Sequence, residues 1–195
     1  MKNSVSSRDI IRLAAPISLS LLIPQISFLA NNIFLGRIGE RELAVSGIAG
    51  IFYLLLVMIG SGLANGIQIQ IARRAGEKDP QGIARIFTNG IMLSLLLSLS
   101  LVVLSLWLAP WLFGAGLQDQ ENAAYSIRFL SIRVWGLPFI MLLQVSNAFY
   151  IATGRSRLLI LQSVSAAVVT VLFDYFLILG KGGFPAMGLE GAAIA

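Results

Sequence analysis

The residue with the clearest capacity for chemistry is Asp174, a carboxylate inside the apolar run from 158 to 180. An ionised side chain near the centre of a bilayer costs about 3 kcal/mol or more, and such residues usually mark an ion or substrate pathway. A carboxylate that can be ionised or protonated in this setting is suited to binding a proton or a sodium ion. We therefore expect Asp174 to bind a coupling cation or a cationic substrate, with a purely structural ion pair as the alternative.

Helical spacing predicts three polar stripes that share an interior with Asp174. They are Pro16, Ser20, Pro24, Ser27 and Asn31 in the first span, Arg133, Ile140, Gln144 and Asn147 in the fourth, and Ser163, Thr170 and Asp174 in the fifth. Residues three and four apart on a helix lie on one face, and lipid tolerates polar groups only where they meet protein or water. Serines on such faces can also serve only as packing contacts between helices, which is our first interpretation of Ser20, Ser27 and Ser163. The predicted substrate- or ion-binding residues are Asp174, Thr170, Asn31, Arg133, Asn147 and Gln144.

Three of these residues are expected at a similar depth. Asn31 lies about five residues before the outer end of its run and Asp174 about six, so at roughly 1.5 Å per residue both are under about 10 Å from the boundary. Arg133 lies near the start of a run that crosses in the opposite direction. An ion pair between Arg133 and Asp174 is therefore geometrically plausible, with Arg133 as the counter-charge.

The elements that must position these residues are membrane helices. The chain of 195 residues is 57% hydrophobic and 12% charged, with a mean hydropathy of +0.85, which describes a protein whose solvent is mostly lipid. It contains no cysteine and no histidine, which excludes disulfides, thiolate metal sites and the commonest metal ligand and base. We expect no cofactor and no metal other than Na⁺ at Asp174.

The apolar runs predict an all-α polytopic membrane protein. A window of roughly 20 residues, enough to cross about 30 Å of hydrocarbon, gives five candidate spans. Residues 187–195 have the composition of the start of a sixth span. The predicted spans are 10–36, 45–72, 86–113, 130–153 and 157–180.

The basic residues predict the orientation, because cytoplasmic loops hold an excess of Lys and Arg. The N-terminus and the even-numbered loops contain nine of the fourteen basic residues, while Arg37, Arg41 and Lys181 lie in the odd-numbered loops. We therefore expect a multi-pass protein of the cell (inner) membrane with a cytoplasmic N-terminus. The net charge of +5 is spread over short loops and does not indicate nucleic acid. The nine bases are Lys2, Arg8, Arg12, Arg73, Arg74, Lys78, Arg85, Arg155 and Arg157.

Glycines in the second span suggest close helix packing. Gly62 and Gly66 have the G-x-x-x-G spacing, and Gly47, Gly50 and Gly60 extend the series. Such a pattern allows two helix backbones to approach closely.

Several motifs together resemble the multidrug and toxic compound extrusion (MATE) family. They are Asn-Asn-Ile-Phe-Leu-Gly-Arg-Ile-Gly at 31–39, Gly154-Arg155, Phe-Asp-Tyr-Phe-Leu-Ile-Leu-Gly at 173–180 and Gly-Leu-Glu-Gly-Ala-Ala-Ile-Ala at 188–195. The stretch Arg-Phe-Leu-Ser-Ile-Arg-Val-Trp-Gly-Leu-Pro at 128–138 resembles the DinF-like branch. The resemblance covers essentially the whole chain, in order.

The resemblance implies a secondary antiporter that exports organic, often cationic, drugs or toxic compounds in exchange for H⁺ or Na⁺. It implies twelve helices in two six-helix lobes around a central cavity. Residues 1–195 resemble the N-terminal lobe alone, so we expect a partial or truncated form whose partners are the lipid bilayer, a small organic substrate and the missing C-terminal lobe.

Two positions depart from the family pattern. The family commonly has an aspartate where this chain has Asn31, and asparagine cannot release a proton. The family's Asn-x-x-x-Asp is here Thr170-Val-Leu-Phe-Asp174. A coupling ion bound in this lobe therefore depends on Asp174.

Three alternatives remain open at this stage. A lipid-linked oligosaccharide flippase of the same superfamily would share the helical plan, although such flippases usually line the cavity with several bases. A non-transporting membrane scaffold would need only packing contacts and loop charges. A membrane enzyme is disfavoured, because one buried acid without histidine or cysteine lacks the paired groups of acid and base chemistry.

Overall fold

The computed structural model describes residues 7–116, 119–180 and 187–194. These residues form seven α-helices and one short 3-10 helix, with no strand among them. Lys2, Lys181 and Ala195, which entered the sequence predictions, lie outside the described residues. The elements are α1 (Ser7–Ile38), α2 (Glu40–Gly76), α3 (Pro80–Gly116), α4 (Gln120–Arg133), η1 (Val134–Gly136), α5 (Leu137–Ala152), α6 (Ser156–Leu179) and α7 (Leu189–Ile194).

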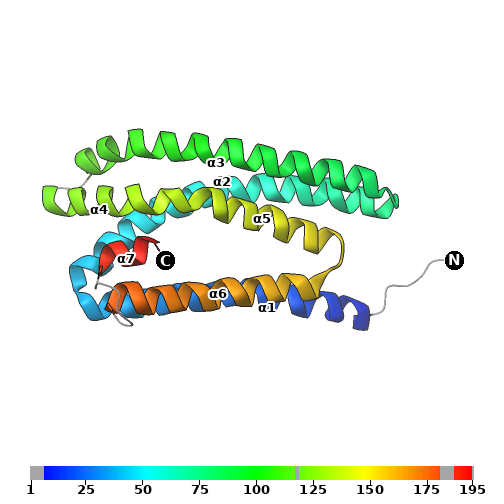
Figure 1. Ribbon diagram of the computed structural model, residues 1–195, viewed down its shortest axis with the longest axis horizontal. Helices are drawn as coiled ribbons and strands as arrows, with labels where there is room; N and C mark the ends of the chain where they lie inside the picture. The colour runs from blue at the N-terminus through cyan, green and yellow to red at the C-terminus, as the bar shows by residue number, and fades with distance from the viewer. Residues whose placement is uncertain (1–6, 117–118, 181–186, 195) are drawn as a thin grey trace.

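Within the described residues, five stretches of helix are long and apolar enough to cross a membrane. They are Ser18–Ile38, Glu40–Gly76, Pro80–Ala115, Gln120–Ala152 and Arg157–Ile178. The prediction of an all-α protein with five spans is therefore confirmed. Successive spans run in opposite directions, as Figure 1 shows.

The fourth span begins earlier than the sequence predicted. The expected start was residue 130, whereas helix α4 begins at Gln120, where the side chain of Asp119 accepts a hydrogen bond from the backbone N–H of Glu121 at 3.0 Å. This capping interaction starts a helix that is too polar for a hydropathy window to detect. The short helix η1 joins α4 to α5 just before Pro138, whose missing N–H prevents a regular α-helical bond at this point.

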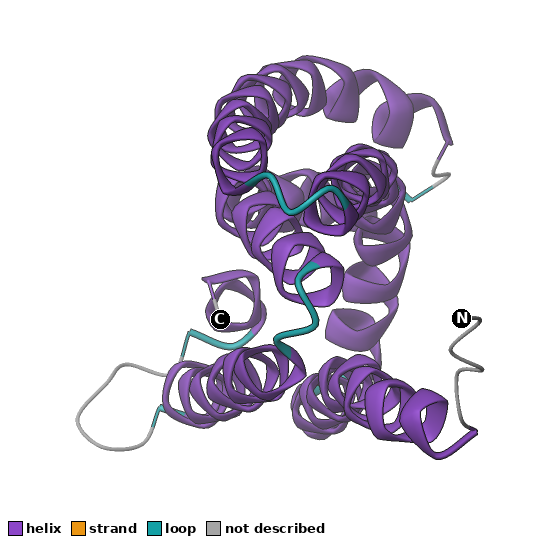
Figure 2. Cartoon of the chain, turned by 90° about the vertical axis from the view of Figure 1, so that its right-hand side faces the viewer, coloured by secondary structure: helices purple, strands orange, loops and turns teal. Residues whose placement is uncertain are grey.

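The helices form two groups. Helix α2 packs against α3, α4 and α5, and α3 also packs against α5, whereas α1 packs chiefly against α6. Helix α7 contacts both α4 and α6 and so connects the two groups at one end. The end-on view in Figure 2 shows α1 and α6 set apart from the other long helices.

Most buried apolar residues lie at the end of the molecule where α1 meets α2. Leu35, Val134 and Leu137 are fully buried there and pack in one cluster with residues from α2, α3 and α7. A smaller cluster of Ile67, Ile71 and Val145 joins α2 to α5 nearer the other end. These two clusters hold α2, α3, α4 and α5 together, and they fix the wall that faces α1 and α6.

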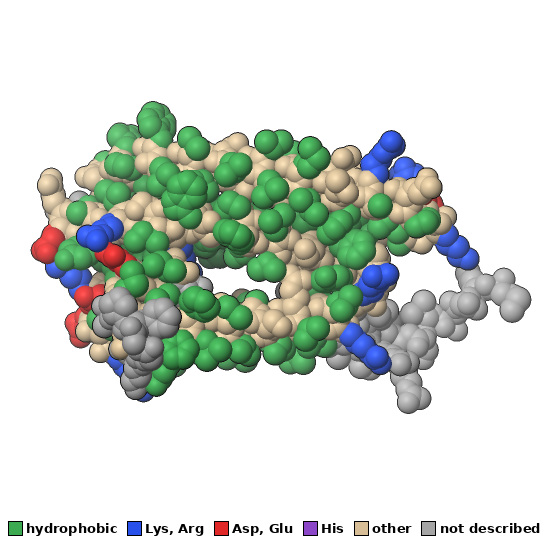
Figure 3. Space-filling model, viewed as in Figure 1, with side chains coloured by type: hydrophobic (Ala, Val, Ile, Leu, Met, Phe, Trp, Pro, Cys, Tyr) green, Lys and Arg blue, Asp and Glu red, His purple; other side chains and the backbone are tan. Residues whose placement is uncertain are grey.

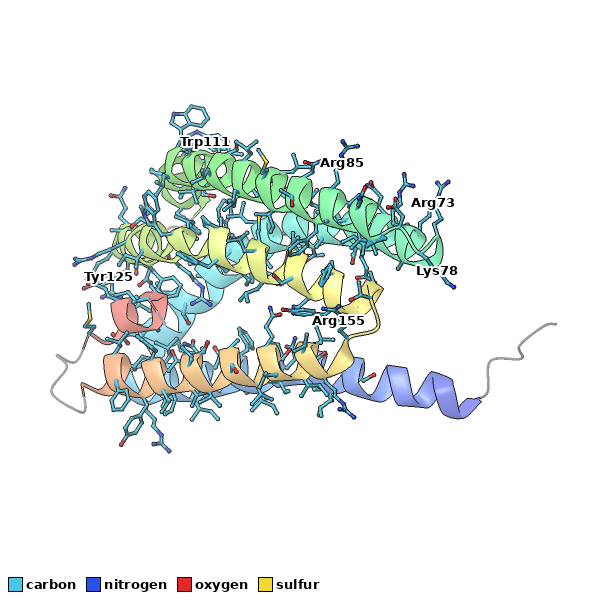
Figure 4. All side chains as sticks on the ribbon, turned by 45° about the vertical axis from the view of Figure 1, so that its right-hand side comes forward. Arg73, Lys78, Arg85, Trp111, Tyr125 and Arg155 are labelled. Carbon is cyan, nitrogen blue, oxygen red and sulfur yellow. The ribbon has the colours of Figure 1, made fainter. Side chains whose placement is uncertain are left out.

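Charged side chains gather at the two ends and leave the middle apolar, as Figure 3 shows. Arg73, Lys78 and Arg155 lie toward the end where the described N-terminus begins, and Tyr125 lies toward the other end (Figure 4). A broad apolar band between two charged ends is the surface that a bilayer-spanning protein presents to lipid.

Within the described part of the chain, the close approach predicted for the glycine series of the second span is found at Gly60 and not at its other members. A Cβ placed on Gly62, Gly66, Gly47 or Gly50 would meet nothing within 4 Å. A Cβ on Gly60 would lie 2.9 Å from the Met141 side chain of α5. Sequence spacing gives a shared face but does not say which face meets a neighbour.

Candidate ion and substrate site

A cavity of about 660 Å³ lies between the two groups of helices. Its walls come from α1, α5 and α6, with contributions from α2, α4 and α7. Most of the lining is apolar, for example Phe28, Phe139 and Ile140. Polar side chains are distributed over this apolar lining, which is the arrangement expected for a site that takes small organic molecules. The neutral polar lining residues predicted from the sequence as site or packing positions are Ser27, Asn31, Gln144, Asn147, Ser163 and Thr170.

The polar face predicted for the first span is the face of α1 that meets the cavity. Pro24, Ser27 and Asn31 all line it, and Ser20 is buried one turn earlier. Pro16 lies on the same helix, but its side chain is outside the described part. Regular spacing within a single helix was enough to predict this face.

Asp174 is fully buried, with 0% of its surface exposed. Its Oδ1 atom accepts a hydrogen bond of 2.8 Å from Nδ2 of Asn31, which links α6 to α1. Its Oδ2 atom is buried without a hydrogen-bond partner in the described part of the chain. Asn31 lines the cavity, whereas Asp174 is not among the described lining residues. The Asp174 carboxylate is therefore held behind the cavity wall by the Asn31 amide, which lines the cavity.

Arg133 does not form the ion pair with Asp174 that depth alone suggested. No contact of 4.0 Å or less joins the two among the described residues, and Nη1 of Arg133 instead donates to the backbone oxygen of Ala192 at 3.1 Å. The guanidinium carbon lies 5.0 Å from the ring centroid of Tyr53 and 5.6 Å from that of Phe129. These aromatic faces and the start of α7 hold the cation, so its contribution to Asp174 is long-range attraction.

Gln144 and Asn147 lie on the cavity wall, as their shared stripe with Arg133 predicted. Nε2 of Gln144 donates to Oγ of Ser61 at 3.0 Å and lies 3.4 Å from the backbone oxygen of Val57, so α5 is tied to α2. The side-chain oxygens of Gln144 and Asn147 are buried and have no partner in the described structure. Both therefore keep unused acceptor capacity inside the wall, and the Gln144 oxygen lies against Gly60 of α2.

Thr170 lines the cavity on α6 one turn before Asp174, and Ser163 lines it two turns earlier still. The Ser27 hydroxyl on the facing helix is buried without a hydrogen-bond partner in the described part. Ser27 and Ser163 therefore line the cavity as well as lying between helices.

Sequence reasoning missed three contributors to the site. Tyr53 of α2 and Gln162 of α6 line the cavity, and Ala192 of α7 accepts the hydrogen bond from Arg133. The position of Gln162 could have been predicted, because it is an amide directly before Ser163 inside a predicted span. The positions of Tyr53 and Ala192 could not, because their roles depend on how separate helices meet.

A family model described as MatE matches residues 16–176, which is most of the chain. The chain belongs to the MatE family. This confirms the resemblance read from the motifs, and the DinF-like branch remains a prediction.

Curated relatives of this MatE chain are named as multidrug resistance proteins. "Probable multidrug resistance protein NorM" of Pseudomonas putida is 31% identical over 188 residues, and the protein of the same name from Synechocystis is 26% identical over 189 residues. The alignments cover 96% and 97% of this chain but 40% and 41% of those relatives. The chain thus spans about two fifths of the length of the relatives it matches.

Solved structures share the fold. The chain matches an "Outward-facing conformation of a multidrug resistance MATE family transporter of the MOP superfamily" and a "Crystal structure of MATE in complex with MaD3S", each with a TM-score of 0.86 and 24% identity. The matches cover 94% and 95% of this chain and 40% and 41% of those chains. At this identity the likeness shows the fold alone, and that fold is the N-terminal half of a MATE transporter.

Proposed function

We propose that this MatE chain forms the N-terminal lobe of a secondary antiporter that exports organic compounds in exchange for H⁺ or Na⁺. The observation that supports this most directly is the buried Asp174, which has one oxygen held by Asn31 and the other unpaired beside an amphipathic cavity. The names of the curated relatives agree with export of drugs. A carboxylate that can gain and lose a cation next to a substrate cavity is what such an exchange needs.

Asp174 is the group to which we assign the coupling ion. A proton would bind its unpaired Oδ2 atom and remove the buried charge. Sodium would need several oxygen ligands, which Asp174, Thr170 and Asn31 together could supply. The described residues contain no group of three or more His, Cys, Asp or Glu that could hold a metal ion, so a sodium site here would need neutral oxygens in addition to the Asp174 carboxylate.

Residues 1–195 act, in this proposal, as one lobe that pairs with a second lobe. The cavity between α5, α6 and α1 holds polar side chains such as Gln144, Asn147 and Thr170, which would be costly to expose to lipid. A second lobe would cover this side and complete the cavity. The lobe would lie in the cell membrane with its N-terminus in the cytoplasm, because Arg73, Arg74 and Lys78 lie at the end where the described N-terminus begins.

A transport assay on the protein expressed from its own full gene tests this proposal. The fluorescent cation rhodamine 123 would be added to the medium around inverted membrane vesicles. H⁺ or Na⁺ would be made more concentrated inside the vesicles than outside. We expect uptake that depends on one of the two gradients and collapses when that gradient is dissipated. Uptake that responds to neither gradient would reject antiport.

A further inference from the structure

A second concave site lies at the end of the molecule where α2 and α3 are joined, with a volume of about 540 Å³. Its lining residues come from the last turns of α2, the first turns of α3 and the connection between them. None of them lines the cavity between the two helix groups. We call this site the α2–α3 cleft. It is lined by Gln70, Arg73, Arg74, Asp79, Gln81, Gly82, Arg85 and Ile86.

The two acids at this end of the hairpin are held by α2 and by the start of α3. Glu77 is shared between Nε of Arg73 at 3.2 Å and Nη1 of Arg74 at 2.8 Å. Asp79 accepts a hydrogen bond of 2.9 Å from the backbone N–H of Gly82 through Oδ1, and its Oδ2 lies 3.6 Å from Nη1 of Arg74. Neither carboxylate contacts the arginine on the α3 side of the cleft.

That arginine is Arg85, and no acidic oxygen lies within 4.0 Å of it in the described part of the chain. Its side chain is exposed. The segment 70–86 contains four basic residues and two acids, so the cleft has an excess of positive charge. A guanidinium with open donors beside further arginines suits a phosphate group, whose oxygens match its planar fork.

Arg85 lies at the depth of the lipid headgroups. Met92, Leu96 and Val103 share its face of α3 by helical spacing, and each is at least half exposed. The stripe ends at the exposed Trp107, 22 residues after Arg85, which is roughly 33 Å along the helix at 1.5 Å per residue. This length is close to the hydrocarbon thickness of about 30 Å, and tryptophan is enriched at its boundary. Arg85 and Trp107 therefore mark the two boundaries.

The α2–α3 cleft is also on the lipid side of the protein. Figure 4 shows Arg73 and Arg85 on the side of the hairpin that lies away from α1 and α6. A second lobe would cover the cavity between the two helix groups, which is on the other side of α2 and α3. The cleft would therefore stay in contact with lipid in the two-lobe protein.

We propose that the α2–α3 cleft binds the headgroup phosphate of an acidic phospholipid, with its acyl chains along the exposed face of α3. Arg85 contacts the phosphate, flanked by Arg73 and Arg74, while Gln70 and Gln81 offer amide groups to headgroup hydroxyls. Basic pockets between membrane helices on the cytoplasmic side are suited to such headgroups. The proposal needs only that α3 crosses a bilayer, and it does not depend on antiport.

Competition between two lipids that differ in headgroup charge tests this assignment. The protein, expressed from its own full gene and purified in detergent, would be mixed with equal amounts of phosphatidylglycerol and phosphatidylcholine that carry the same acyl chains. Native mass spectrometry would then count each bound lipid. We expect phosphatidylglycerol to bind about fivefold more tightly, the effect of one basic residue near an acidic lipid.

Matched variants locate the effect. Arg85→Gln should remove most of the preference for phosphatidylglycerol, and Arg85→Lys should keep most of it, because the charge is retained. Arg157→Gln removes an exposed basic residue at the start of α6, outside the cleft lining, and should leave the preference unchanged. All three should melt as the wild-type protein does without added lipid, since neither arginine has an ion pair in the described structure.

Equal binding of the two lipids by the wild-type protein would overturn the proposal without any variant. A preference that persists in Arg85→Gln would also overturn it, and a loss that is as large in Arg157→Gln would show only diffuse attraction by loop charges. A soluble-anion site is the remaining outcome against it. In that case inorganic phosphate would raise the melting temperature of the wild-type protein but not of Arg85→Gln, and phosphatidylglycerol would have no effect.

Discussion

Asn31 on α1 and Asp174 on α6 are 143 residues apart in sequence and are joined by a hydrogen bond of 2.8 Å from Nδ2 to Oδ1. The bond connects the two helices that are set apart from the rest of the bundle. It also connects a residue that lines the cavity to a carboxylate that does not. A change of charge at Asp174 would therefore act directly on an amide that lines the cavity.

Replacing Asp174 with asparagine should abolish gradient-driven export and leave the fold intact. The variant removes the charge that would bind H⁺ or Na⁺, but its amide oxygen can still accept the hydrogen bond from Asn31. We expect a stability change below about 1 kcal/mol, since the shape and this bond are kept. Transport in vesicles and thermal unfolding in detergent measure the two effects.

Glu190→Gln is the matched control for that variant. It also removes one acid, but from the ion pair with Arg128, outside the cavity-lining residues of the described chain. We expect this control to export normally. Export that is unchanged in Asp174→Asn would remove Asp174 from the coupling mechanism.

Replacing Asn31 with alanine should destabilise the protein by about 2 kcal/mol, because the buried carboxylate loses the amide that donates to it. The melting temperature in detergent measures this change. Asn32→Ala is the matched control, since the Asn32 amide donates to the backbone oxygen of Phe28 within its own helix. If the two variants melt at the same temperature, the bond between Asn31 and Asp174 contributes nothing to stability.

The parts of this structure that sequence could predict are those set within one helix. The faces that hold Asn31, Gln144 and Thr170 follow from helical spacing, and all three line the cavity. The partner of Arg133 could not be predicted in this way. A long side chain at the correct depth can turn toward Asp174 or toward Tyr53, and only the packing of α2 and α7 decides between them.

Helix boundaries and glycine contacts show the same limit. The first third of the fourth span was missed because Gln120, Glu121 and Asn122 are polar, although Asp119 caps a regular helix there. Gly60 and Gly62 are two residues apart in one glycine-rich helix, yet Gly60 alone of the two approaches a neighbour. Spacing cannot distinguish them, because it does not give the rotation of α2 relative to α5.

Replacing Gly191 with alanine should destabilise the contact between α7 and α6. A Cβ at this position would lie 2.6 Å from the backbone oxygen of Leu177, and backbone cannot move aside as a flexible side chain does. We expect a loss of about 2 kcal/mol from overpacking, seen as a lower melting temperature. Gly62→Ala is the control and should be neutral or slightly stabilising, since its Cβ meets nothing within 4 Å in the described structure.

The cytoplasmic N-terminus can be tested by labelling, because the chain contains no native cysteine that would react. Gln81→Cys places one exposed thiol at the start of α3, beside the basic residues of the loop before it, and Gln120→Cys places one at the start of α4, at the opposite end. A membrane-impermeant maleimide should label Gln120→Cys on intact cells and should label Gln81→Cys only after the membrane is opened. The reverse pattern would mean that the chain is inserted with its N-terminus outside, and the excess of Lys and Arg at the Gln81 end would then need another explanation.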